Sequence, residues 1–443
     1  MKLRMLVKLL VLGGISVVLV ILLAAIGGLT QERRNRLFEV EQDIANSYAG
    51  SQQIGGPVFK VTFREFWSEH LYNPGKDTWY DEEMDELRSQ LVFPSVFDYD
   101  GAMSVQERYR GIFKANVFQS EGRISGRVAF PKFESLALRN GSRLELVSVE
   151  ACFMISDPRG LPSIPVLQWN DQPLEFKSGS MLGVFDAGIH AELPNAAELF
   201  GRSFPFSTDL RINGTKQIQF IPVGAENHIS LESKWPHPSF IGEFLAEERT
   251  VSDDGFSAAW NVNSLASSAQ QSISTGRHGI QSFGVSLIDP ISPYPLTDRA
   301  LKYGFLFIFI TFAAFWLFEV LASLRIHPVQ YGFVGLAQSI FFLLLLSLSE
   351  HVGFGLSYAL ASLATIGLIV FYVCHILRGL VRGLAFGGLL GLLYGILYVL
   401  LQSEDHALVA GSVLLFGLMA LAMTLTRKVD WYAVGNHIER SDR

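Results

Sequence analysis

A stretch of 124 residues near the end of the chain, 303–426, carries only seven charged side chains. They are Glu319, Arg325, Glu350, Arg378, Arg382, Glu404 and Asp405. A soluble domain of this size would need many more charges on its surface, whereas the hydrocarbon core of a bilayer excludes them. The preceding segment, 30–302, has 60 charged side chains in 273 positions, close to an ordinary soluble composition. One chain therefore combines a lipid-embedded part with a water-exposed part.

The apolar runs divide the chain into candidate membrane spans. A spanning helix needs about 20 mainly apolar residues. Six such runs are separated by polar breaks, at 9–29, 303–324, 329–348, 356–376, 384–401 and 407–425. We therefore predict an N-terminal transmembrane anchor within 1–29, a large domain at 30–302, a five-helix transmembrane bundle at 303–426 and a tail at 427–443. The first run could also be a cleaved secretory signal, but its 21 apolar residues favour a retained anchor.

Basic residues in the short loops predict the orientation of these spans. Lys and Arg accumulate on the cytoplasmic side of membrane helices. The loops at 349–355 and 402–406 contain neither. Basic residues instead precede the first span and follow the second, fourth and sixth spans, at Lys2, Arg4, Lys8, Arg325, Arg378, Arg382, Arg427 and Lys428. Both termini are therefore predicted to be cytoplasmic, and residues 30–302 are predicted to lie outside.

The charged segment 30–302 has the sequence pattern of β-strands. Residues 59–64 alternate between apolar and polar side chains, the period of a sheet with one wet face. Similar runs occur at 109–118, 122–130, 144–155 and 228–234. Asn170-Asp171 and Asn213-Gly214 each stand between two short apolar-rich runs, as hairpin turns do. We predict a mostly antiparallel, sandwich-like β domain, built as one sheet system or as two.

The same segment offers little sign of catalysis. It contains no GxSxG, HExxH, P-loop, EF-hand or dinucleotide-binding motif. Its 35 acidic and 25 basic residues give a net charge of −10, which argues against a nucleic acid as partner. Cys152 and Cys374 fall in different parts of the chain, so no disulfide is expected. We expect no catalytic residue, no cofactor and no metal ion.

A proline-flanked aromatic segment is the first candidate interaction site. Pro236 and Pro238 restrict the backbone on both sides of His237 and stiffen the segment. We predict that a ridge formed by Trp235, His237, Ser239 and Phe240 docks on a partner or on the membrane part. The alternative is a strand exit whose aromatic residues pack on the domain core.

A glycine pattern in the fifth span is the second candidate. Gly383, Gly387, Gly391 and Gly395 recur at every fourth residue and so share one helix face. A face of small residues allows another helix backbone to approach closely. Packing within the bundle and homodimerisation through this helix would both use such a face.

Ionisable residues near the membrane are the third candidate. Glu319 lies within the second span near its cytoplasmic end, and Glu350 and His351 lie in the loop after the third span. An ionisable group at membrane depth is a functional candidate by default. The structural alternative for Glu319 is an ion pair with Arg325 or Arg378.

The outer loops also raise the question of a metal site. Glu350 and His351 occupy one short loop on the predicted outer side, and Glu404-Asp405-His406 occupies the next. Together they could hold a metal ion, but two histidines of unknown geometry make a weak ligand set. Solvated loop residues explain them more simply, and no metal site is predicted.

Short motifs distributed along the chain resemble those of a known family. Together with one anchor, a β-rich outer domain and five C-terminal spans, they resemble the bacterial inner membrane protein CreD family. The motifs are Gly56-Pro57, Trp235-Pro236-His237-Pro238-Ser239-Phe240-Ile241-Gly242, Leu296-Thr297-Asp298-Arg299-Ala300-Leu301-Lys302-Tyr303, Phe318-Glu319, Arg325-Ile326-His327-Pro328-Val329-Gln330-Tyr331, Leu348-Ser349-Glu350-His351-Val352-Gly353-Phe354 and Asp430-Trp431-Tyr432. The resemblance covers nearly the whole chain and is densest from Trp235 onward.

The resemblance implies an inner-membrane protein of Gram-negative bacteria, with residues 30–302 in the periplasm. It also implies a link to cell envelope integrity and to a two-component response to envelope or metabolic stress. It transfers no catalytic residue. Our first hypothesis is a non-enzymatic protein whose outer domain binds an unknown envelope component while the bundle sits in the lipid bilayer. The alternative is a membrane-embedded transporter or enzyme that uses Glu319, Glu350 and His351.

Overall fold

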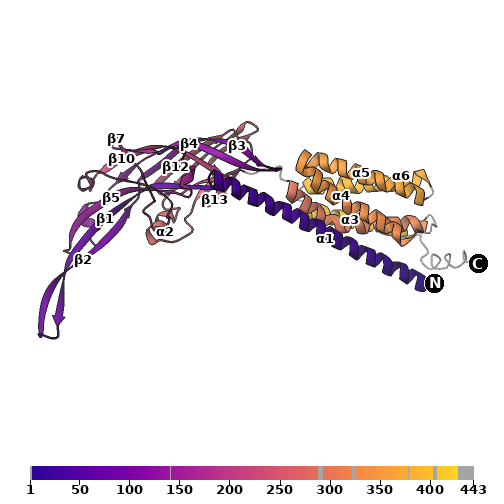
Figure 1. The fold of residues 1–443 in the computed structure, drawn as a ribbon, viewed down its shortest axis with the longest axis horizontal. Helices are drawn as coiled ribbons and strands as arrows, with labels where there is room; N and C mark the ends of the chain where they lie inside the picture. Colours follow the sequence, from indigo (N-terminus) through magenta and orange to yellow (C-terminus); the bar gives the residue numbers. More distant parts are fainter. Residues whose placement is uncertain are drawn as a thin grey trace, which may run out of the picture. The chain divides into compact units, whose positions relative to one another are not determined.

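The computed structural model describes residues 2–139, 141–287, 293–321, 326–377, 379–402 and 407–427 (Figure 1). The chain divides into two compact units. The helical unit comprises residues 1–37 and 291–443, and the β unit comprises residues 38–290. Helix α1 (Lys2–Ser47) is continuous and contributes residues to both.

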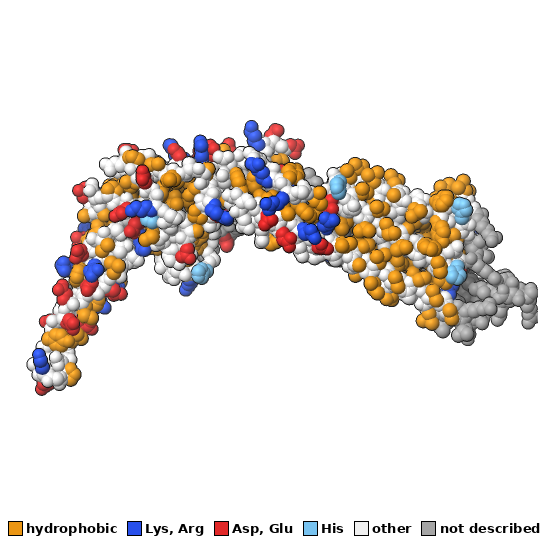
Figure 2. All heavy atoms as spheres, in the orientation of Figure 1, with side chains coloured by type: hydrophobic (Ala, Val, Ile, Leu, Met, Phe, Trp, Pro, Cys, Tyr) orange, Lys and Arg blue, Asp and Glu red, His pale blue; other side chains and the backbone are white. Residues whose placement is uncertain are grey.

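The helical unit contains the predicted membrane helices. They are α3 (Pro293–Leu321), α4 (Pro328–Val352), α5 (Phe354–Ile376), α6 (Leu380–Gln402) and α7 (Ala407–Thr426). Among the described residues, α1 and α3 to α6 are five helices long and apolar enough to cross a bilayer. Helix α7 covers the predicted sixth span. Hydrophobic side chains dominate the visible surface of the helical unit, as lipid exposure requires (Figure 2).

The breaks between helices follow local sequence signals. The side chain of His327 accepts a hydrogen bond from the N–H of Val329, and Gln330 completes a capping box at the start of α4. Pro328 is the first residue of the helix, where its missing N–H costs nothing. Gly353 separates α4 from α5 with φ at +77°, a conformation that favours glycine.

The β unit consists of two eight-stranded sheets, which answers the question that the sequence left open. Sheet A has the order β13 (Pro238–Gly242), β16 (Phe283–Leu287), β11 (Gln217–Phe220), β1 (Gln52–Asn73), β5 (Arg143–Ile155), β9 (Gly188–Glu192) and β8 (Lys177–Ser178), with β2 (Thr78–Val92) paired to β1. Sheet B has the order β14 (Glu248–Ser252), β15 (Gly255–Asn263), β12 (Glu226–Ser233), β3 (Val96–Arg110), β4 (Phe113–Ala129), β10 (Ser203–Thr215), β6 (Val166–Trp169) and β7 (Gln172–Glu175).

Short helices complete the β unit. They are η1 (Phe133–Leu136), η2 (Pro158–Gly160), η3 (Ala196–Glu198) and α2 (Ala269–Thr275). Among the described strand pairs, only β1 with β11 and β3 with β12 are parallel. The prediction of a mostly antiparallel domain is therefore confirmed.

Aromatic side chains from both sheets form the core between them. Phe59 of sheet A has its ring centroid 5.8 Å from that of Phe206 of sheet B. Tyr99 of β3 lies 4.5 Å from Phe220 of β11 by the same measure. Trp260 of β15 is almost fully buried, with its ring centroid 5.7 Å from that of Phe283 of β16. The two sheets thus pack face to face, which confirms the sandwich-like fold.

The C-terminal end of α1 is attached to the β unit by polar contacts. The Arg110 guanidinium lies 2.7 Å from Asp43, and the Lys216 ammonium lies 2.5 Å from Glu41. The Arg159 guanidinium donates a hydrogen bond over 2.9 Å to the carbonyl oxygen of Asn46. The last turns of α1 are therefore an integral part of the β unit.

One predicted hairpin is confirmed and the other is wrong. Asn170 and Asp171 have φ of +47° and +64° and connect β6 with β7, as in a tight two-residue hairpin. Asn213 and Gly214 instead lie inside β10 and pair with β4. The chain turns at Lys216, with φ at +68°, and β11 joins the other sheet, so β10 and β11 are not hairpin partners.

Two predicted strand boundaries are also wrong. The predicted strand at 109–118 is divided by a turn at Gly111, whose φ is +63°. The next predicted strand, 122–130, is the continuation of β4, which runs without a break from Phe113 to Ala129. Apolar and polar side chains alternate on both sides of these points, so periodicity alone did not locate the turn.

A two-stranded arm extends from sheet A (Figure 1). β1 pairs with β5 only as far as Phe66, whereas its pairing with β2 continues to Asn73. We define the arm as residues 67–84, the part of this hairpin beyond the pairing with β5. Its turn follows a sequence signal for a turn, Asn73-Pro74-Gly75.

Candidate functional site

Two ionic clusters connect helices α1, α3 and α4 in the helical unit. The first surrounds Glu350 of α4, whose side chain is only 7% exposed. The Tyr294 hydroxyl of α3 donates a hydrogen bond over 3.0 Å to Glu350 Oε1, and Arg33 Nε of α1 lies 3.7 Å from the same oxygen. A carboxylate with so little access to water needs a hydrogen bond and a positive charge for compensation. These two residues supply them.

The second cluster surrounds Glu319 of α3. The Lys8 ammonium of α1 forms an ion pair with Glu319 Oε1, and the Tyr331 hydroxyl of α4 donates to Oε2 over 2.7 Å. The N–H of Ile326 donates to Oε1 over 3.4 Å, and Lys8 donates to the Ile326 carbonyl oxygen over 3.1 Å. Both oxygens of Glu319 therefore have partners from the protein.

The two clusters repeat one arrangement at opposite ends of α3 and α4. In each, a carboxylate on one helix accepts a hydrogen bond from a tyrosine on the other and lies beside a cation of α1. Arg33 follows Lys8 by 25 residues. This separation is about 38 Å along an α-helix, close to the thickness of a bilayer with its interfacial regions, about 40 Å. Helix α1 is thus connected to the other two helices near both of its membrane ends.

The structure shows a partner of Glu319 that was not among the predicted ones. Its cationic partner is Lys8, which the sequence did not indicate because the two residues are 311 positions apart. Arg325 and Arg378 lie outside the described residues. His375 is exposed, and its Nδ1 lies 3.0 Å from the carbonyl oxygen of Phe371 on its own helix. Among the described residues, Glu319 therefore connects α3 with α1 and α4.

His351 is not part of either cluster. It is exposed, and its Nδ1 lies 3.1 Å from the Ser347 carbonyl oxygen of the same helix. Glu404, Asp405 and His406, which the sequence placed in the adjacent loop, lie outside the described residues. Within the described ranges, no group of three or more His, Cys, Asp and Glu residues is arranged to hold a metal ion.

The four glycines of α6 fall into two pairs. A Cβ on Gly383 would lie 2.9 Å from Cys374 Cα of α5, and a Cβ on Gly387 would lie 2.3 Å from a methyl group of Val370. These two glycines therefore permit close packing of α6 on α5. A Cβ on Gly391 or Gly395 would meet no described atom within 4 Å. Homodimerisation through this face stays a prediction.

The proline-flanked segment of the β unit is mostly packed on the core. Trp235 is partly buried, and its indole N–H donates over 3.0 Å to the carbonyl oxygen of His237. Phe240 lies in β13, with its ring centroid 5.9 Å from that of Trp260. Ser239 pairs with β16 and is half-buried, whereas His237 is exposed. Of the four predicted residues, His237 is the exposed one, and its ring centroid lies 6.1 Å from that of Trp235.

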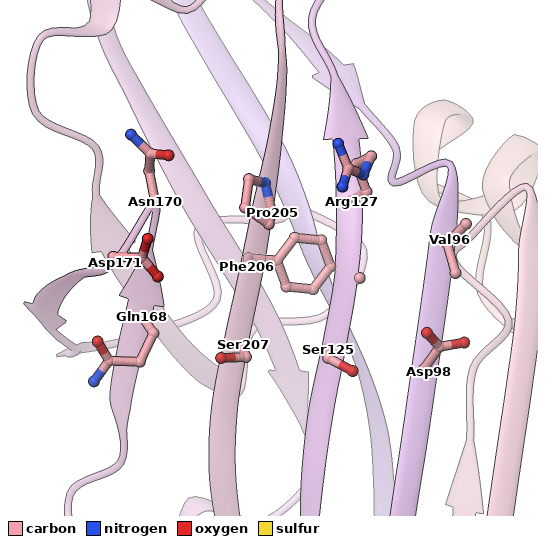
Figure 3. A pocket seen from close by; sticks show the side chains of 11 residues that line it. Val96, Asp98, Ser125, Arg127, Gln168, Asn170, Asp171, Pro205, Phe206 and Ser207 are labelled. Carbon is pink, nitrogen blue, oxygen red and sulfur yellow. The ribbon is translucent and has the colours of Figure 1, made fainter.

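A polar row on the outer face of sheet B was missed in the sequence. Two open depressions of about 410 Å³ share Asp98 and Ser125. Strand pairing aligns six polar side chains across the sheet, namely Asn261, His228, Asp98, Ser125, Ser207 and Gln168. Figure 3 shows four of them on neighbouring strands. Burial raises the pKa of Asp98, and the nearby His228 opposes this shift. The alternation within each strand was visible, but the register between strands was not.

The fold and the clusters define a multi-pass membrane protein with a β-sandwich unit between its first and second membrane helices. A family model described as "Inner membrane protein CreD" matches residues 4–432. The chain therefore belongs to the CreD family, and it is an inner membrane protein with several membrane helices.

A curated relative supports the same assignment. The chain is 33% identical over 410 residues to the inner membrane protein CreD of Escherichia coli (strain K12), covering 91% of this chain and 88% of the relative. Solved structures give only weak similarity. An M1 zinc metallopeptidase from Deinococcus radiodurans matches 44% of this chain and 42% of its own length, with 10% identity and a TM-score of 0.21. A two-domain M1 zinc metallopeptidase bound to L-arginine gives 9% identity, the same coverage and a TM-score of 0.21.

Proposed function

We propose that this protein supports cell envelope integrity and the envelope stress response by non-enzymatic binding through its β unit. Membership of the CreD family is consistent with this role, and the relative is named as an inner membrane protein and not as an enzyme. The helical unit then serves as the membrane support of the β unit. The partner is an envelope component, protein or otherwise, that meets the outer surface.

The proposal includes the orientation predicted from loop charges. Both termini are cytoplasmic and residues 30–302 are periplasmic, in accord with the positive-inside rule. In this orientation, Lys8 lies at the cytoplasmic end of the first membrane span and Arg33 at the end that leads into the β unit. The β unit would then face the periplasm and its envelope components.

The main support for a non-enzymatic role is that both membrane carboxylates are paired with side chains of neighbouring helices. Glu319 is engaged by Lys8 and Tyr331, and Glu350 is engaged by Tyr294 and Arg33. A transporter or membrane enzyme would need such a group to change its protonation or ligand during its cycle. The partners here instead suit a permanent contact between helices.

The alternative, a transporter or enzyme using Glu319, Glu350 and His351, is tested with His351→Ala in the full chain. Because His351 is exposed and contacts only its own helix, we expect full complementation of envelope stress resistance in cells without the native gene. Proximity labelling from the β unit should also enrich envelope components over the same label on an unrelated anchor. Loss of resistance at normal protein levels, together with no enrichment, would contradict the proposal.

A further inference from the structure

The arm at residues 67–84 presents aromatic side chains that the fold does not cover. Trp79 is 61% exposed, Tyr72 is 46% exposed and Tyr80 is 44% exposed. An isolated two-stranded hairpin is marginally stable in water, so exposed tryptophan and tyrosine side chains at its end are costly without a partner. Tryptophan and tyrosine are also the residues most enriched at the energetic centres of protein interfaces.

The aromatic side chains are held in place before any partner binds. The ring of His70 stacks on that of Trp79, with centroids 5.0 Å apart and planes 3° from parallel. Tyr72 lies 5.2 Å from Trp79 by the same measure, and its hydroxyl donates over 2.5 Å to Asp77. The side chains therefore form a preorganised cluster at the end of the arm, which reduces the entropy lost on binding.

Carboxylates surround this cluster. Residues 67–84 contain five acidic residues and one basic residue, Lys76, so the arm has a net charge of −4. The acidic residues are Glu69, Asp77, Asp81, Glu82 and Glu83. Red acidic side chains lie along the arm beside its orange hydrophobic side chains in Figure 2. Arginine and lysine side chains of a partner would find both carboxylates and aromatic rings here.

One pair of carboxylates on the arm is unfavourable for the isolated chain. Glu69 of β1 lies directly opposite Glu82 of β2 in the strand register. Both side chains are exposed, and like charges in this position destabilise a strand pair. A cation bound between them would remove the repulsion, so the pair favours a basic partner.

The geometry points to a docking site on the arm for a protein with a lysine- and arginine-rich surface. This inference deepens the proposed function and rests on it, since it names the kind of envelope partner that the β unit binds. An anionic lipid surface would be repelled by the net charge of the arm. A second copy of the β unit is also disfavoured, because residues 30–302 have a net charge of −10.

The test places a photo-crosslinking amino acid at Tyr80 in the full-length protein in intact cells. The same amino acid at Glu175, an exposed residue of β7, serves as the control position. We expect a single protein adduct from position 80 and none from position 175. Sequencing of the crosslinked peptide should place it on a surface rich in lysine and arginine.

Charge-reversed variants test the chemistry of the contact. The double variant Glu69→Lys/Glu82→Lys should reduce the adduct roughly tenfold or more, since it removes complementary charge. Glu69→Gln/Glu82→Gln should reduce it less, and Glu175→Lys should leave it unchanged. Thermal unfolding of the purified full-length variants checks that the fold is retained.

Four results would overturn the inference: no adduct, a lipid adduct, an adduct with a second copy, or an adduct that charge reversal does not reduce. Its failure is separable from failure of the proposed function. If the charge-reversed arm variants form as much adduct as the wild type and still complement stress resistance, the arm inference is wrong. The proposed function would then still be decided by the His351→Ala and proximity-labelling experiments.

Discussion

Glu65 is a fully buried carboxylate at the base of the arm. Ser142 Oγ donates to it over 2.7 Å, and the N–H groups of Leu138 and Arg139 donate over 3.1 and 3.0 Å. Arg88 Nε forms an ion pair with its other oxygen at 3.1 Å. Glu65→Ala should lower the free energy of unfolding by about 1–3 kcal/mol, because three hydrogen-bond donors and the Arg88 guanidinium lose their acceptor. Thermal unfolding of the full-length protein measures this, with Glu175→Gln on the exposed strand β7 as the neutral control.

The same residue predicts a pH dependence of stability. The hydrogen bond from Ser142, assisted by the backbone donors and Arg88, lowers the pKa of Glu65 in the folded state. A folded-state pKa below the unfolded one gives stability that is present above about pH 4.5 and is lost as the pH falls through the folded pKa. The difference in midpoint between wild type and Glu65→Gln should therefore shrink below about pH 4.5. A difference that stays constant down to about pH 3 would contradict this assignment.

Residue-scale contacts of this kind were not accessible from the sequence. Glu65 receives its hydrogen bonds from a loop that begins 73 positions later in the chain. Lys8 and Glu319 are further apart still, at 311 positions. A single sequence reveals that a charge is present in an apolar context, but it does not reveal which distant side chain compensates that charge.

Among the elements, α6 offers the clearest prediction. Gly383 and Gly391 share a helix face, but only Gly383 is packed closely against α5. Gly383→Leu should separate the two helices and lower the thermal unfolding midpoint in detergent, whereas Gly391→Leu should leave that midpoint unchanged. Equal effects of the two substitutions would contradict the packing described here. A lower dimer fraction for Gly391→Leu alone would support the predicted homodimer.

Strands and turns differed in how well the sequence predicted them. Core strands such as β5 were found because one face is buried and the side chains alternate. The arm was missed because both of its faces are exposed. β2 is exposed along nearly its whole length, and its apolar residues do not alternate with polar ones. The hairpin prediction at Asn213-Gly214 failed for a different reason. A Cβ on Gly214 would lie 2.5 Å from the Phe118 ring, so glycine is needed there for packing.

At the scale of the whole molecule, the division of the chain into two units follows the distribution of charged residues along the sequence. The division into a charged segment and an apolar one predicted the membrane class and the β unit from composition and patterning. The pairing order of the strands was not predictable, since sheets A and B each contain strands from distant parts of the sequence. The two ionic clusters also depend on the whole chain, because each connects α1 near the N-terminus with α3 and α4 in the C-terminal part.

The central claim is that the membrane charges hold helices together while the β unit carries the function. The most direct test is complementation of envelope stress resistance by the double variant Lys8→Met/Glu319→Gln in cells without the native gene. Replacing both partners of a buried ion pair is often nearly neutral, whereas removing one leaves the other charge unpaired. The amide oxygen that this variant introduces at position 319 can still accept the hydrogen bond from Tyr331.

We predict that the double variant protects cells as well as the wild type does, and that Glu319→Gln alone is less stable. Protein level and thermal midpoint of each variant are measured alongside resistance. A double variant that is folded and normally abundant but gives no protection would contradict the account. That result would show that function requires an ionisable group at Lys8 or Glu319.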